Sequence, residues 1–137
     1  MKRVSTLIAL LFATAFLPLF AQGPMSPEEQ EKAMYEAIDK EIERQISQLN
    51  LSDWQIFKID STLTHDYMAM TDELTALRLS KVSNSSAYLA VQDKWQEAIY
   101  QSYCAILDDE QRAKYLKSGA AKAKKARDKR AEKSPQK

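Results

Sequence analysis

Turn-forming residues are scarce in this chain, which has only 2 glycines and 4 prolines among its 137 residues. An all-β sandwich or barrel needs a turn about every ten residues, so the composition excludes these folds. The two glycines, Gly23 and Gly119, also lie too far apart to form a glycine-rich phosphate-binding loop. The sequence therefore predicts an all-α fold, and its length suffices for one domain.

The first 21 residues have the features of a secretory signal peptide. Lys2 and Arg3 precede an uncharged, strongly apolar segment at residues 4–20. This segment is shorter than the ~20 apolar residues that a membrane-spanning helix needs. We therefore expect cleavage after Ala21 and a mature protein in the periplasm, without stable membrane insertion. An uncleaved membrane anchor is the alternative.

Helical periodicity predicts four helices in a domain at residues 22–125. Ser26, followed by Pro27 and Glu29, is typical of a capped helix start. Gly119 lies in the predicted fourth helix and is expected to weaken it by about 1 kcal/mol relative to alanine. Apolar residues at spacings of three and four are expected to face the core: Tyr35, Ile38, Ile42, Ile46 and Leu49 in the first helix, Ile59, Leu63, Met70, Leu74 and Leu77 in the second, and Tyr88, Val91, Trp95, Ile99 and Ile106 in the third.

Two of the predicted helix starts share one pattern: a leucine, a capping residue, any two residues and a glutamine. The first is Leu51-Ser52-Asp53-Trp54-Gln55, and the second, 56 residues later, is Leu107-Asp108-Asp109-Glu110-Gln111. Ser52 and Asp108 can each accept a hydrogen bond from the backbone amide of the glutamine three residues on. The glutamine side chain can return to the backbone of the capping residue.

This pair of motifs resembles the paired LTxxQ motif of the Spy/CpxP family of small periplasmic proteins. The resemblance covers about residues 28–125, with Ser52 and Asp108 in place of the motif's threonine; both cap at least as well. It implies an antiparallel helical hairpin that pairs with a second copy into a thin, curved homodimer. It also implies a structural, helix-capping role for the motif residues, which are Leu51, Ser52, Gln55, Leu107, Asp108 and Gln111.

A second apolar stripe is present on two of the predicted helices. Phe57, Met68 and Leu79 lie nearly opposite the main stripe of the second helix, and Leu89 and Tyr100 form a similar group on the third. A simple amphipathic helix has one stripe, so the second is expected to be covered by a dimer partner or to bind client proteins. The alternative is a compact four-helix bundle in which another helix of the same chain covers it.

Charge is strongly polarised along the chain. Residues 22–111 contain 7 Lys/Arg and 17 Asp/Glu, a net charge of −10, whereas residues 112–137 contain 11 and 2, a net charge of +9. We expect residues 126–137 to form a disordered basic tail. The basic segment either stays free to meet acidic unfolded chains, acidic partners or anionic membranes, or folds back on the Glu-rich first helix. Its candidate binding residues are Lys122, Lys124, Lys125, Arg127, Lys129 and Arg130.

The chain has few residues suited to catalysis or metal binding. A single histidine, His65, and a single cysteine, Cys104, exclude a Cys/His zinc site and an internal disulfide. With no activated nucleophile, metal cluster or phosphate loop, we expect no enzyme activity, no catalytic residue, no metal and no cofactor. A soft-metal site at His65 and Met68, and a cross-link between two chains through Cys104, are the alternatives.

The expected function follows from the resemblance and the exposed apolar stripes. Members of the family are known or proposed as ATP-independent chaperones, as inhibitors of envelope-stress sensors and, in some branches, as metal-binding proteins. We expect a periplasmic, chaperone-like protein that binds unfolded or partly folded envelope proteins under stress. The alternative is a regulatory or metal-responsive periplasmic protein that inhibits an envelope-stress sensor by binding its sensor domain. Nucleic acid is a poor partner for an exported protein.

Overall fold

The structure is a computed structural model that describes residues 25–134, and this part of the chain is all-α, as predicted. The predicted signal peptide, residues 1–21, and the last three residues of the predicted tail lie outside the described residues. None of the helices within residues 25–134 is both long and apolar enough to cross a membrane. The elements are α3 (Pro27–Leu49), α4 (Asp53–Leu79), α5 (Ser85–Ile106), α6 (Asp109–Tyr115), a π-helical turn η1 (Leu116–Ala120) and α7 (Ala121–Lys133).

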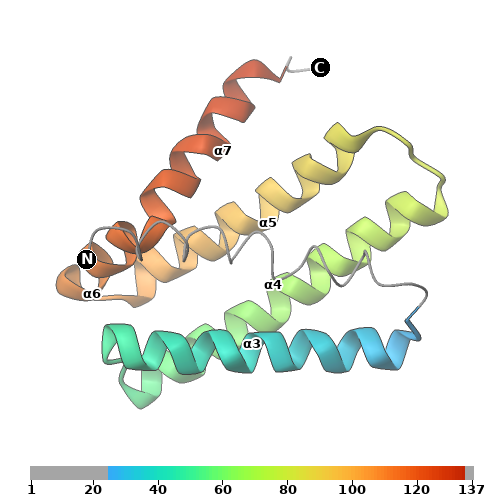
Figure 1. The fold of residues 1–137 in the computed structure, drawn as a ribbon. Helices are drawn as coiled ribbons and strands as arrows, with labels where there is room; N and C mark the ends of the chain where they lie inside the picture. Colours follow the sequence, from blue (N-terminus) through green and yellow to red (C-terminus); the bar gives the residue numbers. More distant parts are fainter. Residues whose placement is uncertain (1–24, 135–137) are drawn as a thin grey trace, which may run out of the picture.

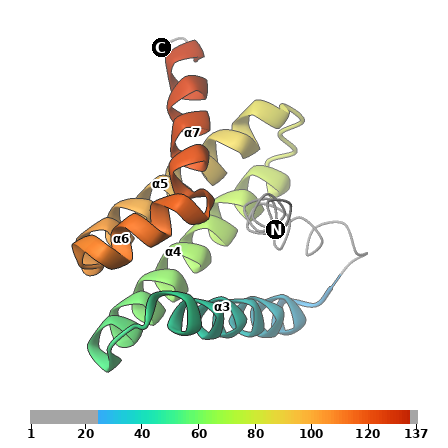
Figure 2. The same cartoon turned by 60° about the vertical axis from the view of Figure 1, so that its left-hand side comes forward.

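The central helix is α4, which contacts α3 on one side and α5 on the other. α4 and α5 lie side by side and run in opposite directions, so the chain returns to the end of the molecule where α3 ends (Figure 1). There α6 contacts α3, and the chain then turns at η1. α7 leaves at a steep angle to α6 and packs against α5 (Figure 2).

Capping residues start three of the helices as predicted. The side chain of Ser26 accepts a hydrogen bond from the backbone amide of Glu29 at 3.2 Å, and the Glu29 carboxylate accepts one in return from the Ser26 amide. Ser52 and Asp108 start α4 and α6 with the same reciprocal arrangement. These boxes satisfy amides that a helix N-terminus otherwise leaves without a partner.

The predicted core stripe is confirmed in α4 except at Leu77, which is only half-buried, and it is partly displaced in α3. On α5 the predicted stripe faces the core, but only Ile99 is fully buried there. Tyr35 and Ile46, expected in the core, are 39% and 37% exposed, while the neighbouring Met34 and Gln45 are buried. A shift of one residue along a helix rotates the face that points inward by about 100°. A prediction based on the spacing of apolar residues also cannot identify a buried glutamine such as Gln45. The buried apolar residues form one cluster: Met34, Ile38, Ile42, Leu49, Leu51, Ile59, Leu63, Tyr67, Met70, Leu74, Ile99, Tyr103 and Leu107.

The predicted fourth helix is interrupted at Gly119. This residue has φ 121° and ψ −10° inside the π-helical turn, a backbone conformation that a side chain would disfavour. Gly119 therefore makes the change of direction between α6 and α7 possible, and the expectation that it merely weakens a continuous helix is wrong. Beyond it, α7 continues to Lys133, so residues 126–133 are helical where the sequence analysis expects disorder.

Candidate functional site

The two Leu-xxx-Gln motifs lie against each other, although 56 residues separate them in the chain. The side-chain nitrogen of Gln55 donates to the side-chain oxygen of Gln111 at 2.6 Å, and the nitrogen of Gln111 donates to the oxygen of Gln55 at 3.0 Å. Both glutamines are buried. The start of α4 and the start of α6 are thus joined through one pair of amides.

Each glutamine also completes its own capping box. Gln55 Oε1 accepts from the Ser52 amide at 3.0 Å, and Gln111 Oε1 accepts from the Asp108 amide at 3.0 Å. Ser52 Oγ and Asp108 Oδ1 accept in turn from the glutamine amides at 3.3 and 2.8 Å. The two motif leucines, 8% and 2% exposed, belong to the core cluster. All six predicted motif residues therefore have a capping, bridging or packing contact.

A row of exposed apolar side chains follows one face of α4. Phe57 is 64% exposed, Met68 40% and Leu79 79%, in agreement with the predicted second stripe. Successive members are eleven residues apart, which is about three helical turns, so they point in nearly the same direction. Small hydroxyl residues (Ser61, Thr64, Thr75) lie between them on this face. We call Trp54, Phe57, Met68 and Leu79 the α4 row.

Three further exposed apolar residues lie beside or within this row and were not predicted there. Trp54, one turn before Phe57, is 59% exposed. From the sequence it is predicted only as a variable position of the first motif, although its spacing places it on the same face as Phe57. Tyr35 of α3 reaches Met68, with its hydroxyl 3.9 Å from the sulfur. Ile46 lies eleven residues after Tyr35 on the same face of α3. The apolar surface therefore spans two helices.

The predicted members on α5 differ from each other. Leu89 is 41% exposed, near the connection between α4 and α5. Tyr100 is only partly exposed, because α7 packs over it: the guanidinium carbon of Arg127 lies 5.6 Å from its ring centre and Lys124 Nζ 5.9 Å. Tyr100 is therefore covered within the same chain, contrary to its prediction as part of an open surface.

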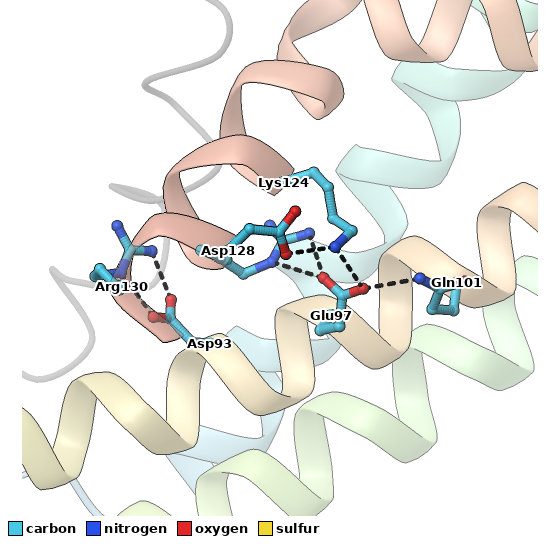
Figure 3. Close-up of polar contacts among 7 residues, drawn as sticks. Asp93, Glu97, Gln101, Lys124, Asp128 and Arg130 are labelled. Atoms are coloured by element: carbon cyan, nitrogen blue, oxygen red, sulfur yellow. Dashed lines mark hydrogen bonds and ion pairs between the residues drawn. The ribbon is translucent and has the colours of Figure 1, made fainter. Parts of the chain in front are cut away.

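α7 is held on α5 by charge, as Figure 3 shows. Arg130 makes two hydrogen bonds with Asp93, of 2.6 and 2.7 Å. Arg127 lies 3.1 Å from Glu97, and Lys124 reaches the other oxygen of Glu97 at 3.3 Å. Asp93 and Glu97 are one helical turn apart on α5, and the basic residues of α7 match this spacing. These ion pairs explain why residues 126–133 are ordered.

Glu97 is the centre of this charged cluster. Partial burial alone would raise its pKa, but hydrogen bonds from Gln101, Arg127 and Lys124 outweigh that effect and lower the pKa below its ordinary value. The basic segment therefore folds back, but on α5 rather than on the Glu-rich first helix. Arg127 is buried by this contact.

The other basic residues predicted as a binding surface face away from α5. Lys122, Lys125 and Lys129 are exposed and make no ion pair within residues 25–134. Their spacings of three and four place them on one face of α7. The predicted set thus divides into residues that hold α7 in place, Lys124, Arg127 and Arg130, and lysines that present charge to solvent.

The only histidine and the only cysteine are not brought together. The His65 side chain is 75% exposed and lies 2.8 Å from the carboxylate of Asp66, while Cys104 is half-buried on α5. Within the described part of the chain, no three His, Cys, Asp or Glu residues cluster in a way that could hold a metal ion.

Comparisons of the chain with known protein families, with curated proteins and with solved structures give no match.

Proposed function

We propose that the protein is a homodimeric, ATP-independent chaperone of the Spy/CpxP type, with an antiparallel hairpin fold, that binds partly unfolded envelope proteins in the periplasm. The observation that carries the proposal is the α4 row together with Tyr35 and Ile46. Large apolar side chains that remain exposed on a monomer usually mark an interaction surface.

The composition of the row suits weak and varied binding. Trp54 and Phe57 offer rigid aromatic faces, and Met68 offers a flexible, polarisable side chain that adapts to different partners. The hydroxyl residues between them can hydrogen-bond to the backbone of an extended chain. Repeated apolar contacts separated by polar positions favour reversible capture of many clients over tight binding of one.

The test is suppression of aggregation without nucleotide. At equimolar protein, the light scattering of a chemically denatured substrate diluted into buffer is expected to fall by at least half. A variant with Phe57→Ser, Met68→Ser and Leu79→Ser is expected to lose most of this effect while keeping its helical circular dichroism. The control, with Ala105→Ser, Ala113→Ser and Ala126→Ser, changes three exposed apolar residues outside the row and is expected to behave as the wild type. Unchanged scattering with the wild-type protein would contradict the proposal.

Measurement of the oligomeric state tests whether a second copy of the chain, rather than a client protein, covers the α4 row. If a second copy covers it, the Phe57→Ser, Met68→Ser, Leu79→Ser variant becomes monomeric in light scattering coupled to size-exclusion chromatography. The chaperone proposal expects the variant to remain a dimer, because the row then serves clients and not the second copy.

The lysine face of α7 favours a second candidate function, inhibition of an envelope-stress sensor. Lys122, Lys125 and Lys129 present a positive surface that an acidic patch on a sensor domain would complement. Changing all three to glutamine is expected to abolish sensor binding and leave aggregation suppression intact. Calorimetry with zinc, copper and nickel tests the metal-responsive form of this candidate.

A further inference from the structure

A cavity of about 80 Å³ lies where α3, α5 and the α6–η1–α7 segment meet, and no residue of the α4 row lines it. Three tyrosines line it: Tyr100, Tyr103 and Tyr115. The rings of Tyr103 and Tyr115 stack with centres 4.9 Å apart and planes inclined by 17°. Ala120 and Ala123 lie on the η1–α7 side. The cavity thus has flat, apolar walls built by four different elements.

Two of the residues that line the cavity each carry a polar atom that is buried without a hydrogen-bond partner in the described part of the chain. These atoms are Gln45 Oε1 and the hydroxyl of Tyr103, on residues that are 3% and 1% exposed. The orientation of Gln45 is set by Glu41, whose carboxylate accepts from the Gln45 amide nitrogen. Gln45 therefore offers an acceptor, and Tyr103 can both donate and accept. A buried polar atom without a partner is destabilising, so a ligand that satisfies it gains affinity.

The charges around the cavity favour a neutral ligand. Its two cations are already engaged: Arg44 hydrogen-bonds to Glu41 at 3.0 Å through Nε, and Arg127 pairs with Glu97. Burial raises the pKa of Tyr103 well above its ordinary value, and the negative charge of Glu41 raises it further. An added anion would meet the same unfavourable environment.

We propose that this cavity is a binding site for a small neutral molecule that carries a hydroxyl group on a compact aromatic or apolar body. The hydroxyl hydrogen-bonds to Gln45 Oε1 or to the Tyr103 hydroxyl, and the body packs on the tyrosine rings. An enclosed apolar cavity of about 150 Å³ accepts benzene. This cavity has about half that volume but is partly open to solvent, so a molecule of the size of phenol fills it only in part and extends out of its opening. The site is distinct from the α4 row and does not depend on the chaperone proposal.

Phenol, toluene and benzoate are the probes. Titration of the ¹⁵N-labelled full chain with phenol to about 20 mM at pH 7 is expected to give saturable amide shifts at Gly119 and Ala120 and at the Gln45 side-chain amide. Toluene has the ring but no hydroxyl, and benzoate has a charge; both are expected to bind at least tenfold more weakly. Equal binding of toluene would overturn the assigned hydrogen bond, and equal binding of benzoate the assigned neutrality. If phenol causes no saturable shift, the cavity holds only water and the proposal fails.

Two substitutions locate the site. Ala123→Leu fills the cavity from α7 and is expected to abolish phenol binding; Ala126→Leu, an exposed control on the same helix, is expected to leave it unchanged. Gln45→Met keeps the side-chain volume but removes the acceptor, and is expected to weaken binding about tenfold. Wild-type affinity in the Ala123→Leu protein would show that phenol binds elsewhere. If Gln45→Met fails to fold, the toluene comparison still tests the hydrogen bond in the wild-type chain.

Discussion

The side chains of Gln55 and Gln111 donate hydrogen bonds to each other in both directions, and each also donates to the main chain ahead of the other's helix. Gln55 Nε2 reaches the carbonyl of Ile106 at 3.2 Å, and Gln111 Nε2 reaches that of Asn50 at 3.3 Å. Each of these carbonyls lies two residues before a capping residue. The arrangement has an approximate two-fold symmetry, and it makes two helix starts depend on each other.

Replacement of Gln55 by leucine is expected to lower the free energy of unfolding by about 3 kcal/mol. The change removes one of the partners of Gln111 Oε1 and one of those of Gln111 Nε2. It leaves the Ser52 amide and the Ile106 carbonyl without the hydrogen bonds that Gln55 makes to them. Urea unfolding followed by circular dichroism measures the effect. Gln48→Leu, at an exposed position on α3, is the control and is expected to change stability by less than about 0.5 kcal/mol.

A double-mutant cycle tests whether the two glutamines act as a unit. Gln111→Leu alone is expected to cost about as much as Gln55→Leu. The double variant is expected to be more stable than the sum of the two by about 1–2 kcal/mol, because no glutamine is then left without its partner. Strictly additive losses would show that each glutamine acts only in its own capping box.

The sequence predicted the helix starts and most of the core because those features have local signals. The capping boxes at Ser26, Ser52 and Asp108 depend on residues three positions apart, and the inward stripe of α4 depends on spacings of three and four. The same patterns revealed that Phe57, Met68 and Leu79 share a second face. The sequence shows that the two motifs repeat one pattern. It does not show that Gln55 and Gln111 hydrogen-bond to each other.

What escaped the sequence depends on residues that are distant in the chain. α7 is held in place by ion pairs such as that of Arg130 with Asp93, 37 residues away. A segment rich in Lys, Arg and Ala contains no local signal that would identify Asp93 as the partner. From the sequence, Gly119 is predicted only to weaken a continuous helix, because no local pattern indicates that its φ is positive. The positive φ is known only from the structure, in which the chain changes direction between α6 and α7. Tyr100 could not be separated from Leu89 without knowing which one α7 covers.

Acid is expected to release α7 from α5. The lowered pKa of Glu97 means that its stabilising contribution is present above pH 4.5, its ordinary value, and is lost as the pH falls through its folded-state pKa. Amide chemical shifts of residues 121–133, followed from pH 6 to pH 2.5, are expected to show a transition centred below 4.5. Arg127→Gln is expected to move that transition upward, whereas the outward-facing control Lys129→Gln leaves it in place. A transition insensitive to Arg127→Gln would exclude Glu97 as its cause.

Alkaline pH is expected to destabilise the core. Burial raises the pKa of Tyr67, Tyr103 and Tyr115 above the ordinary value of 10.0, so the unfolded chain loses these protons before the folded chain does. The stabilising effect is full below pH 10 and falls as the pH rises above it; for three tyrosines the loss is about 4 kcal/mol at pH 11. Urea midpoints from pH 8 to pH 11 measure it. Tyr103→Phe is expected to reduce the loss by about a third, and an unaltered pH dependence would contradict the assignment.

Gly119→Ala is expected to destabilise the junction between α6 and α7 by about 1–3 kcal/mol. At φ 121° a Cβ atom meets the neighbouring backbone, and the chain must relax the turn or bear the strain. In a continuous helix the same substitution would stabilise by about 1 kcal/mol, so the sign of the change distinguishes a required glycine from a tolerated one. Hydrogen exchange is expected to rise in α7 more than in α4, because Gly119 positions the helix that Arg127 and Arg130 hold on α5. Ala121→Gly, two residues later in regular helix, is the matched control and is expected to cost about 1 kcal/mol for the ordinary reason of helix propensity.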